Sequence, residues 1–327
     1  MNLRRRSFLH LAAGTATLPV ASRIGCAQGF PSRPITLVVP YPAGGPTDLV
    51  ARIIAEPLRA MFGQTVIVEN VTGGSGNIGV GRVVRATPNG YTIVVSNNGS
   101  IVLNAALYAL PFDPLRDLVP VALMSSNPQI IISKKSIPAQ TLSELMTWLR
   151  DNQDKVSVGI AGSMAAVSAT HFQNLTSAKF QLVPYRGAAP AIQDLIGGQI
   201  ELMFDQLSNA LPQVKSGNVK GYAVAASRRS PSAPEIPTVD EVGLPGFYGA
   251  LWQAMWAPRD TPPEIIAPIS TAVMQILADP AVRQRLADAG QDVVPAEQQT
   301  PTWLAAHQKA EAEKWWPIIK AANLKGE

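Results

Sequence analysis

The sequence predicts an α/β protein built from two domains, and three observations lead to this prediction. Short runs rich in β-branched residues alternate with amphipathic helical stretches from residue 35 onward, which is the β-α-β rhythm of a parallel sheet. Of the 327 residues 46% are apolar and 15% are charged, which suffices for a sizeable core. About ten predicted strands exceed one ordinary sheet, so two α/β domains are expected.

The first 27 residues have the pattern of an export signal. Arg4 to Arg6 form a basic start, residues 8–20 are apolar, and small residues precede the expected cleavage after Ala27. The run Arg5-Arg6-Ser7-Phe8-Leu9 resembles the twin-arginine export motif, with general secretion as the alternative route. The mature protein is therefore expected in the periplasm.

Cys26 is the only cysteine, and it leaves with the signal, so no disulfide or thiol chemistry is expected in the mature chain. Lipidation of Cys26 is a competing interpretation, but Arg23 stands where a lipoprotein signal carries an apolar residue. The signal also holds four of the 27 basic residues and no acid. The remaining 23 basic residues balance the 23 acidic ones, so we expect no nucleic-acid binding. No run of 18 uncharged apolar residues follows the signal, so no membrane-spanning body is predicted.

The first predicted domain opens with a strand at residues 35–39 and a helix at 48–62. Gly63 ends this helix as a left-handed cap, and Pro57 is expected to kink it. Its apolar stripe comprises Val50, Ile53, Ile54, Leu58 and Met61. A strand at 66–69, a glycine-rich turn at 73–79, a helix to about 86 and a strand at 91–95 follow.

Further short strands are predicted along the middle of the chain, most of them separated by helical patterns. They span residues 121–124, 130–133, 156–160, 181–183, 200–204 and 221–225. The segments 127–128 and 246–253 are candidate crossovers between the two domains. The carboxyl end is predicted to be helical at 263–278, 280–289 and about 301–322.

Three polar turns that contain glycine follow neighbouring strands of the first domain. The carboxyl ends of parallel strands converge on one sheet edge, where α/β proteins bind ligands, and N–H groups at helix starts attract anions. We therefore expect an anion site there, although each turn taken alone can be a plain tight turn. Its candidate residues are Tyr41, Ala43, Gly44, Gly45, Thr47, Asp48, Gly74, Ser75, Gly76, Asn77 and Asn97.

Strand ends of the second domain carry a matching set of polar residues, so the two domains are expected to face each other across a cleft. Asp205 follows the strand at 200–204 and is either a site residue or a helix cap. His171 is expected to be a hydrogen-bonded core histidine, and His307 to be solvated. The remaining candidates here are Gly162, Ser163, Ala165, Tyr185, Arg186 and Gly187.

The sequence does not contain the known catalytic and cofactor motifs in complete form. The chain contains no G-x-S-x-G, no H-E-x-x-H, no phosphate-loop motif and no metal-spaced Cys/His cluster, so no metal and no catalysis are expected. Residues 74–79 fit G-x-G-x-x-G, but no Asp or Glu occurs between Glu69 and Asp113 to hold a ribose. We therefore expect no cofactor.

Several motifs occur in a fixed order that resembles the Bug family, the solute receptors of tripartite tricarboxylate transporters. The resemblance extends over roughly residues 30–320. The motifs include Tyr41-Pro42-Ala43-Gly44-Gly45-Pro46-Thr47-Asp48, Pro88-Asn89-Gly90-Tyr91-Thr92, Val183-Pro184-Tyr185-Arg186-Gly187 and Gly243-Leu244-Pro245-Gly246-Phe247.

The resemblance implies a type II periplasmic-binding-protein fold, with two α/β lobes around a hinged ligand cleft. The expected limits are 30–128 with 252–327 for one lobe and 129–251 for the other. A monomer would capture a small organic carboxylate, largely through backbone N–H groups, and deliver it to a tripartite tricarboxylate-type permease. A receptor that feeds a membrane sensor kinase is one alternative. An exported enzyme acting on a carboxylic acid through His171 with Asp205 or Ser163 is the more distant one.

This chain departs from the family pattern near the expected site. Ala165 and Val167 stand where glycines are usual, Val71-Thr72 replaces Arg-Pro, and Asn97-Asn98 and Ile101 stand where a threonine and a histidine are common. The identity of the ligand is therefore not carried over from the family.

Overall fold

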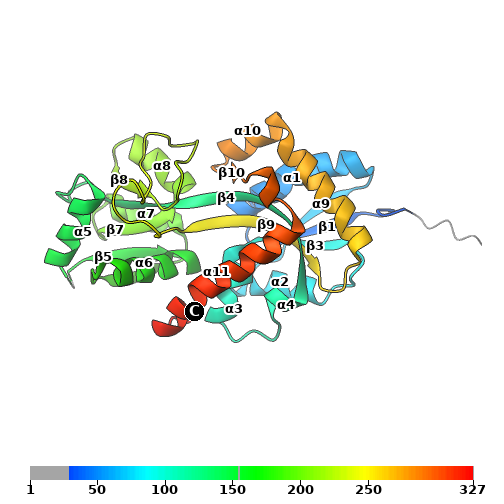
Figure 1. Ribbon diagram of the computed structural model, residues 1–327, viewed down its shortest axis with the longest axis horizontal. Helices are drawn as coiled ribbons and strands as arrows, with labels where there is room; N and C mark the ends of the chain where they lie inside the picture. Colours follow the sequence, from blue (N-terminus) through cyan, green and yellow to red (C-terminus); the bar gives the residue numbers. More distant parts are fainter. Residues whose placement is uncertain (1–28, 154, 327) are drawn as a thin grey trace, which may run out of the picture.

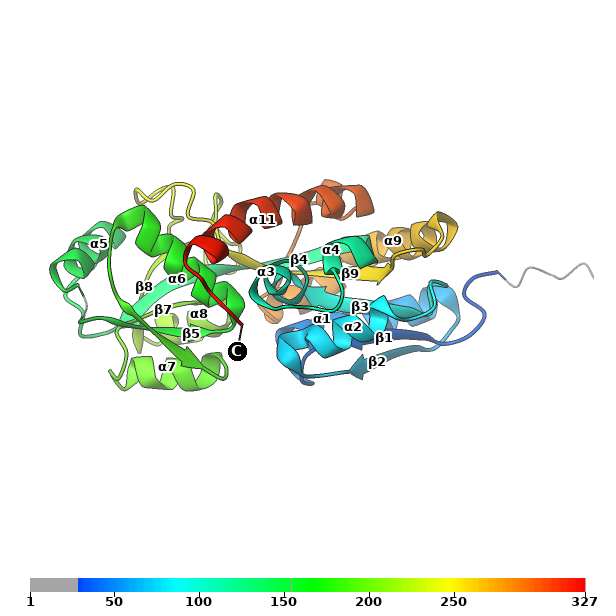
Figure 2. The same cartoon turned by 90° about the horizontal axis from the view of Figure 1, so that it is seen from below.

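The computed structural model describes residues 29–153 and 155–326, which form two α/β lobes joined by two long strands (Figures 1 and 2). The proposed export signal and its cleavage position lie outside the described residues. Within them, no single helix is long and apolar enough to cross a membrane, and the one candidate pair is bent by 78°. 

The first lobe contains a sheet of three parallel strands, β1 (Ile35–Val39), β2 (Val66–Asn70) and β3 (Thr92–Asn97), with β1 in the middle. Strand β9 (Ala250–Pro258) pairs antiparallel with β3 and with β4 (Leu118–Lys134), and β10 (Asp292–Val293) adds to β4. The helices of this lobe are α1 (Pro46–Phe62), α2 (Asn77–Val84), α3 (Asn104–Leu107), α4 (Pro114–Asp117), α9 (Pro263–Ala278), α10 (Pro280–Asp288) and α11 (Pro301–Ala321). 

The second lobe contains β5 (Ser157–Ala161), β6 (Gln181–Tyr185), β7 (Leu202–Gln206) and β8 (Val219–Val224). Strand β5 lies between β6 and β7 and is parallel to both, while the second part of β4 pairs antiparallel with β7 and β8. The helices are α5 (Leu142–Asp151), α6 (Ser163–Thr176), α7 (Ala188–Ile196) and α8 (Leu207–Lys215).

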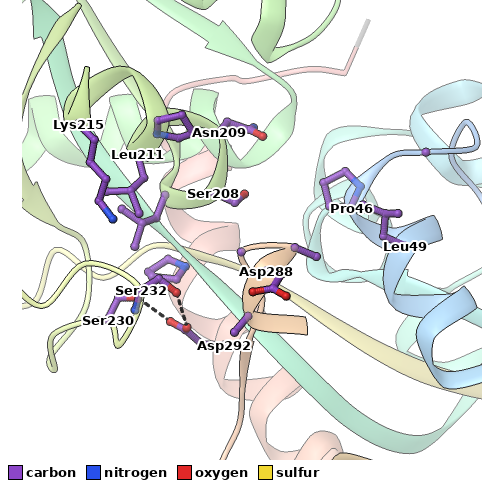
Figure 3. A pocket seen from close by; sticks show the side chains of 17 residues that line it. Pro46, Leu49, Ser208, Asn209, Leu211, Lys215, Ser230, Ser232, Asp288 and Asp292 are labelled. Carbon is purple, nitrogen blue, oxygen red and sulfur yellow. Dashed lines mark hydrogen bonds between the residues drawn. The ribbon is translucent and has the colours of Figure 1, made fainter. Parts of the chain in front are cut away.

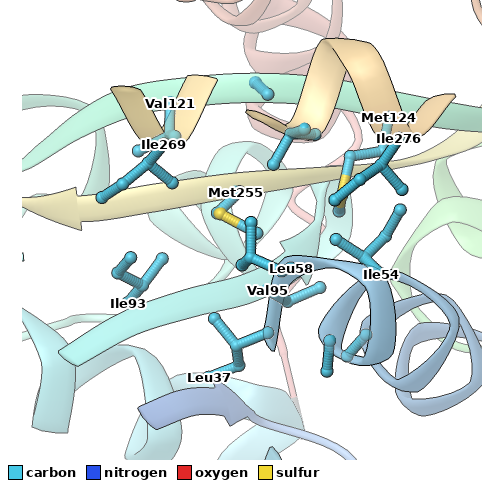
Figure 4. Close-up of a cluster of buried hydrophobic side chains, with 14 of the residues drawn as sticks. Leu37, Ile54, Leu58, Ile93, Val95, Val121, Met124, Met255, Ile269 and Ile276 are labelled. Carbon is cyan, nitrogen blue, oxygen red and sulfur yellow. The ribbon is translucent and has the colours of Figure 1, made fainter. Parts of the chain in front are cut away.

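The sheet of the first lobe is covered on both faces, which explains why its strands are almost continuously apolar. Alternate residues of β1 point to opposite sides: Leu37 and Val39 join a core with α1 and α9, and Val38 joins another with α2 and α11. Figure 4 shows the first of these cores, in which Ile54 of α1 and Ile276 of α9 meet the strands.

Helix α1 begins two residues earlier than predicted, at Pro46, and runs on through Pro57. Gly63 follows it with φ 62° and ψ 16°, as the prediction of a left-handed cap required. Four residues of the predicted apolar stripe are buried, but the fifth, Met61, is 46% exposed. Met61 lies in the last turn of α1.

The two strands predicted at 121–124 and 130–133 are one strand of 17 residues, β4. Its polar middle looked like a break in the sequence, yet Ser126, Asn127 and Pro128 stay paired with β9 at Trp252, Leu251 and Ala250. Strands β4 and β9 therefore pass from one lobe to the other side by side, as Figure 1 shows. They form the hinge at the predicted crossovers.

The lobes also touch through an apolar cluster at the side of the hinge. Leu103, Trp315 and Ile319 of the first lobe pack with Met164 and Val167 of α6. Helix α11 thus lies over the boundary between the lobes, and Figure 2 shows it reaching α6. Lys314 of α11 also donates from Nζ to the backbone oxygen of Tyr248, at 2.7 Å.

Candidate functional site

A cavity of about 240 Å³ lies between the lobes where the strands of both sheets end. We call it the interlobe cavity. Its wall comes from the segments after β1, β2 and β3, from the start of α6, from the end of β7 and from the hinge strands. The lining residues are Tyr41, Ser75, Asn97, Gly99, Asn104, Gln129, Ala161, Gly162, Ser163, Met164, Ala165, Phe204, Asp205, Gln206 and Leu251.

Tyr41 and Asn97 form the wall of the first lobe. The Tyr41 hydroxyl donates to Asn97 Oδ1 at 2.9 Å, and the backbone N–H of Gly99 donates to the same oxygen at 2.9 Å. Burial raises the pKa of Tyr41, so the hydroxyl is neutral. A Cβ at Gly76 would lie 3.3 Å from the Tyr41 oxygen, which explains why a glycine with φ 95° backs this wall.

Asn104 joins the two walls of the cavity. Its Nδ2 donates to the backbone oxygen of Ser75 at 3.0 Å and to Asn77 Oδ1 at 2.9 Å, within the first lobe. Its Oδ1 accepts from the Ser163 hydroxyl at 3.2 Å, which belongs to α6 of the second lobe. A direct hydrogen bond between two lining residues therefore connects the lobes at the cavity.

The start of α6 supplies N–H groups to the cavity. Gly162 precedes the helix with φ 86° and has no side chain to cap it, while Ala166 is the first residue whose N–H bonds back, to the oxygen of Gly162. The N–H groups of Ser163, Met164 and Ala165 precede this first bond and have no acceptor within the helix. The helix dipole adds partial positive charge at the same place, so this wall favours an anion.

Asp205 is the ionisable residue at the floor of the second lobe. Its Oδ1 accepts from the Gln206 N–H at 2.8 Å and from Asn209 Nδ2 at 3.4 Å. Its Oδ2 is buried and has no hydrogen-bond partner in the described part of the chain. Burial raises the pKa of Asp205 to about 6, although both hydrogen bonds favour the ionised form. It does not cap α8 through its side chain, because the cap position is Gln206.

The turn between Tyr41 and Asp48 is stabilised from within. Asp48 is 1% exposed and accepts hydrogen bonds from the Gly44 N–H at 2.8 Å, from Arg52 Nε at 2.8 Å and from Asn70 Nδ2 at 2.9 Å. Burial opposes ionisation, but these three donors outweigh it and hold the pKa of Asp48 below its ordinary value. The Gly44 N–H is thus already engaged inside the turn.

The structure brings together part of the predicted residue set. Seven predicted residues line the interlobe cavity: Tyr41, Ser75, Asn97, Gly162, Ser163, Ala165 and Asp205. Eleven lie outside its lining: Ala43, Gly44, Gly45, Thr47, Asp48, Gly74, Gly76, Asn77, Tyr185, Arg186 and Gly187. Among these, the Tyr185 hydroxyl donates to Asp194 Oδ2 at 2.7 Å, and Arg186 is exposed.

Sequence reasoning missed the lining residues that do not lie in glycine turns. Asn104 belongs to a short helix, and Gln129 and Leu251 belong to the hinge strands. The predicted crossovers were the one sequence feature that could have indicated Gln129 and Leu251. Strands that join two lobes run along the bottom of the cleft between them. Nothing in the local pattern around Asn104 indicated a site.

A second, larger cavity of about 560 Å³ lies between the first turn of α1, α8 and the loop after α10. Figure 3 shows Pro46 and Leu49 on one side of it and Ser208, Asn209 and Lys215 on the other. Its half-buried carboxylate already has partners, because Asp292 accepts from the hydroxyls of Ser230 at 2.8 Å and Ser232 at 3.3 Å. The interlobe cavity, to which both lobes contribute and where the first N–H groups of α6 have no acceptor within the helix, is therefore the better candidate site.

Both histidines of the described region pack against aromatic rings. His171 stacks on Phe247 at 5.8 Å between ring centroids and meets Trp315 edge-on at 5.6 Å, and it is half-buried and not fully in the core as expected. The expectation that His307 is solvated is wrong, because its ring stacks on Trp303 at 4.5 Å and contacts Trp252 at 5.0 Å. Burial lowers the pKa of both. No group of three or more metal-ligating side chains is found within residues 29–153 and 155–326.

The family model described as "Tripartite tricarboxylate transporter family receptor" matches residues 50–324 of the chain. Among curated proteins, a protein of Agrobacterium vitis from the TAR-I ttuE-ttuC' intergenic region is 38% identical over 299 residues. That alignment covers 90% of this chain and 86% of the relative.

Three solved structures resemble the chain over nearly its whole length. MatC from Rhodopseudomonas palustris with bound malate is 38% identical, with a TM-score of 0.77 over 89% of this chain and 100% of that one. Rpa4515 from the same organism, with adipate, is 31% identical, with a TM-score of 0.79 over 90% and 99%. The periplasmic binding protein BugD is 36% identical, with a TM-score of 0.76 over 91% and 100%.

Proposed function

The chain belongs to the receptor family of tripartite tricarboxylate transporters and has the two-lobed type II periplasmic-binding-protein fold; from this we propose that it captures a small organic carboxylate in the interlobe cavity and delivers it to a membrane permease. The relatives with malate and adipate support the ligand class. The permease is proposed from the description of the family.

The observation that carries the proposal is the uncapped start of α6 at the wall of the interlobe cavity. Three N–H groups and the positive end of a 14-residue helix face a space to which both lobes contribute. A hydrogen bond to a charged group contributes about 1.5–3 kcal/mol and a helix terminus about 0.3–2 kcal/mol. A few such contacts, less the ordering costs of binding, support a micromolar dissociation constant at about −8 kcal/mol.

In this proposal the lining residues contact the ligand, and the other predicted residues hold them in place. The Asp48 network fixes the turn that carries Tyr41, and Asn77 fixes Asn104. The bond from Ser163 to Asn104 draws the lobes together over the acid. Bending of β4 and β9 would open the cavity for release.

We also propose limits for the lobes and a location for the protein. Residues 30–128 with 252–327 would form one lobe and residues 129–251 the other, a division supported by the separate cores on either side of the hinge. The periplasm is proposed as the location, since BugD is a periplasmic binding protein. Cleavage after Ala27 remains a prediction from the sequence.

A thermal-shift screen against mono-, di- and tricarboxylates, aromatic acids, amino acids and amides tests the proposal, with calorimetry on the acids that stabilise the protein. At 100-fold excess over the dissociation constant, a ligand should stabilise the fold by about 2.7 kcal/mol. We expect saturable binding of one acid class with no product after incubation. Turnover of the bound acid would contradict the receptor role, and stabilisation by neutral or cationic compounds alone would contradict carboxylate binding.

Two glycine variants test the α6 site itself. Gly162 and Gly198 have φ of 86° and 77°, and a Cβ at either would meet no atom within 4 Å, so alanine strains both equally, by about 1–2 kcal/mol. Only Gly162 lies at the cavity. We expect Gly162→Ala to weaken binding of the identified acid about tenfold, while Gly198→Ala leaves it unchanged. Equal affinities in calorimetry would remove α6 from the site.

A further inference from the structure

A half-buried histidine lies in the contact between the two lobes. His171 belongs to α6 of the second lobe, and its ring stacks on Phe247 of the same lobe. Its edge-on contact with Trp315 joins it to α11 of the first lobe, and both of these neighbouring rings are buried. Burial lowers the pKa of His171, so the ring is mostly neutral at pH 7. A neutral ring is therefore packed between one aromatic residue of each lobe.

Lys314 of α11 brings a positive charge to the same contact. Its Nζ lies 4.2 Å from the ring centroid of Trp315 and donates to the backbone oxygen of Tyr248 at 2.7 Å. The charge of Lys314 lowers the pKa of His171 further, while a hydrogen bond from the imidazole to the backbone of Gly246 opposes this only in part. One positive charge is thus already present in the contact, and a second one on His171 would be repelled.

The elements packed on α6 provide no anion that compensates for Lys314. Helix α6 has no charged side chain besides the histidine itself, and β5 and residues 99–103, which pack on it, have none. Strand β7 also packs on α6 and ends with Asp205 and Gln206. Asp205 lines the interlobe cavity together with Ser163, which lies two helical turns before His171.

Two further elements bring titratable groups to the surroundings of this contact. On α11, Glu311 accepts from two indole N–H groups, and its charge acts on Lys314 and His307. In the second lobe, the Tyr248 hydroxyl donates to the exposed Asp240 at 2.9 Å. Of all these charges, that of Lys314 is the one that shifts the pKa of the α6 histidine.

We propose that His171 makes the contact between the lobes sensitive to pH: the neutral ring holds the lobes together, and protonation loosens them. A protonated ring would stand beside Lys314 in a partly desolvated space, with no facing carboxylate. Helix α6 also supplies a wall of the interlobe cavity, so loosening at His171 would open this cavity. The response would arise in the ligand-free protein, whichever acid the cavity binds.

The direction of the effect follows from the change in solvation of the ring. When the lobes part, water reaches His171 and its pKa returns toward the ordinary value of 6.5. The parted form therefore binds the proton more tightly than the joined form does. As pH falls below about 6.5, protonation shifts the population toward the parted form. Acid would thus favour release of a bound ligand.

Distances between spin labels on the two lobes test the proposal without any ligand. A chain that begins at residue 28 has no cysteine, so labels attach only at introduced positions, Ala60→Cys on α1 and Gln193→Cys on α7, both exposed. Double electron–electron resonance at pH 7.5 and 5.5 measures the ratio of parted to joined molecules. We expect acid to raise this ratio about fivefold more in the labelled parent than in its His171→Gln variant, at the lower end of ordinary coupling between sites.

His307→Gln is the matched control, because the ring of His307 contacts Trp303 and Trp252 within the first lobe. This variant should respond to acid as the parent does. Carboxylates such as Asp205 titrate in all three proteins, so the comparison isolates the histidine. A response in His171→Gln that equals or exceeds that of the parent would overturn the proposal, and so would loss of the response in His307→Gln.

Proton NMR tests the physical cause in the same chain, which has only two histidines. The His307→Gln variant assigns their ring signals. We expect the pKa of His171 to lie below 6.5 and to rise in Lys314→Gln, which removes the charge and keeps a donor for Tyr248. A pKa of 6.5 or above, or one that Lys314→Gln leaves unchanged, would contradict the proposal. None of these results depends on carboxylate binding, so the proposed function would stand.

Discussion

Asp205 should make the stability of the ligand-free protein depend on pH. Its pKa is about 6 in the fold and near 3.8 in the unfolded chain, so the folded state holds the proton more tightly. A raised carboxyl pKa lowers stability as pH rises from the unfolded value through the folded one, and the loss is then constant. The difference of about 2 in pKa corresponds to at most about 3 kcal/mol.

We therefore expect Asp205→Asn to stabilise the protein by up to about 3 kcal/mol at pH 7 and to have little effect at pH 4. Urea denaturation of both proteins at pH 4, 5 and 7, without ligand, measures this. An equal effect at all three values would mean that the substitution acts through packing and not through charge.

Asp48 is expected to behave in the opposite way. Its pKa lies below 3.8 in the fold, so its contribution to stability is complete above the unfolded value and is lost as pH falls through the folded value. Asp48→Asn should cost about 1–3 kcal/mol at pH 7, because Gly44, Arg52 and Asn70 all lose a charged acceptor, and less at pH 3. Denaturation midpoints at both pH values test this, with exposed Asp240→Asn as the control.

At the residue scale, the sequence predicted part of the cavity lining but not the hydrogen bonds that already occupy other predicted residues. Gly162, Ser163 and Asp205 were identifiable because they follow strands, and strand ends converge by topology. Asp48 has the same local signal, but its carboxylate bonds back into its own turn, and only the tertiary position of Asn70 reveals this. His307 was misjudged because the rings that bury it come from β9 and from the start of α11.

At the element scale, repetitive patterns were predicted well. The position of the hinge was also predicted, but not the continuous strand that forms part of it. The bounds of α9 follow from prolines, and the prediction of 263–278 is confirmed to the residue. Strand β4 was divided in two because serines, an asparagine and a proline resemble a loop. Those polar residues are accommodated because β9 pairs with them at the hinge, with register shifts at 120–122 and 123–125. Pairing with a strand more than 120 residues away cannot be predicted from local composition.

Helix α6 contributes to the contact between lobes as well as to the cavity. Val167 is fully buried in the apolar cluster with Trp315 and Ile319, while Leu175 of the same helix is 46% exposed. We expect Val167→Ala to cost about 1–2.5 kcal/mol through the cavity that it leaves, and Leu175→Ala to cost less than about 0.5 kcal/mol. Urea midpoints compare them; a similar loss for both variants would mean that the cluster adds nothing to stability.

At the scale of the whole molecule, the lobes are too closely joined to unfold separately. Strands β4 and β9 belong to both lobes, and the cluster around Trp315 links them at the side. We expect one cooperative transition in scanning calorimetry, with equal calorimetric and van't Hoff enthalpies. Two resolved transitions in the ligand-free protein would show that the hinge does not couple the lobes.

The α/β class was predictable from the alternation of strand-like and helical stretches, and the two-lobed fold from the resemblance to the Bug family. Both are confirmed. The apolar contact between the lobes was not predictable, because it depends on α11 lying over their boundary. The tryptophans of α11 predicted only that the helix packs. Its Leu304 and Ala312 pack in a core of the first lobe, while Trp315 also meets Met164 and Val167, nearly 150 residues earlier in the chain.

The place of β9 in the sheet determines when the first lobe can be completed. Strands β3 and β4 do not pair with each other, because β9 lies between them. All of α5 to α8 is therefore synthesised before the strand that fills this gap. A growing chain on the ribosome holds an incomplete first sheet until about residue 258 has emerged, whereas the second lobe, apart from β9, is continuous in sequence. The lobe that begins the protein is thus the last to be finished.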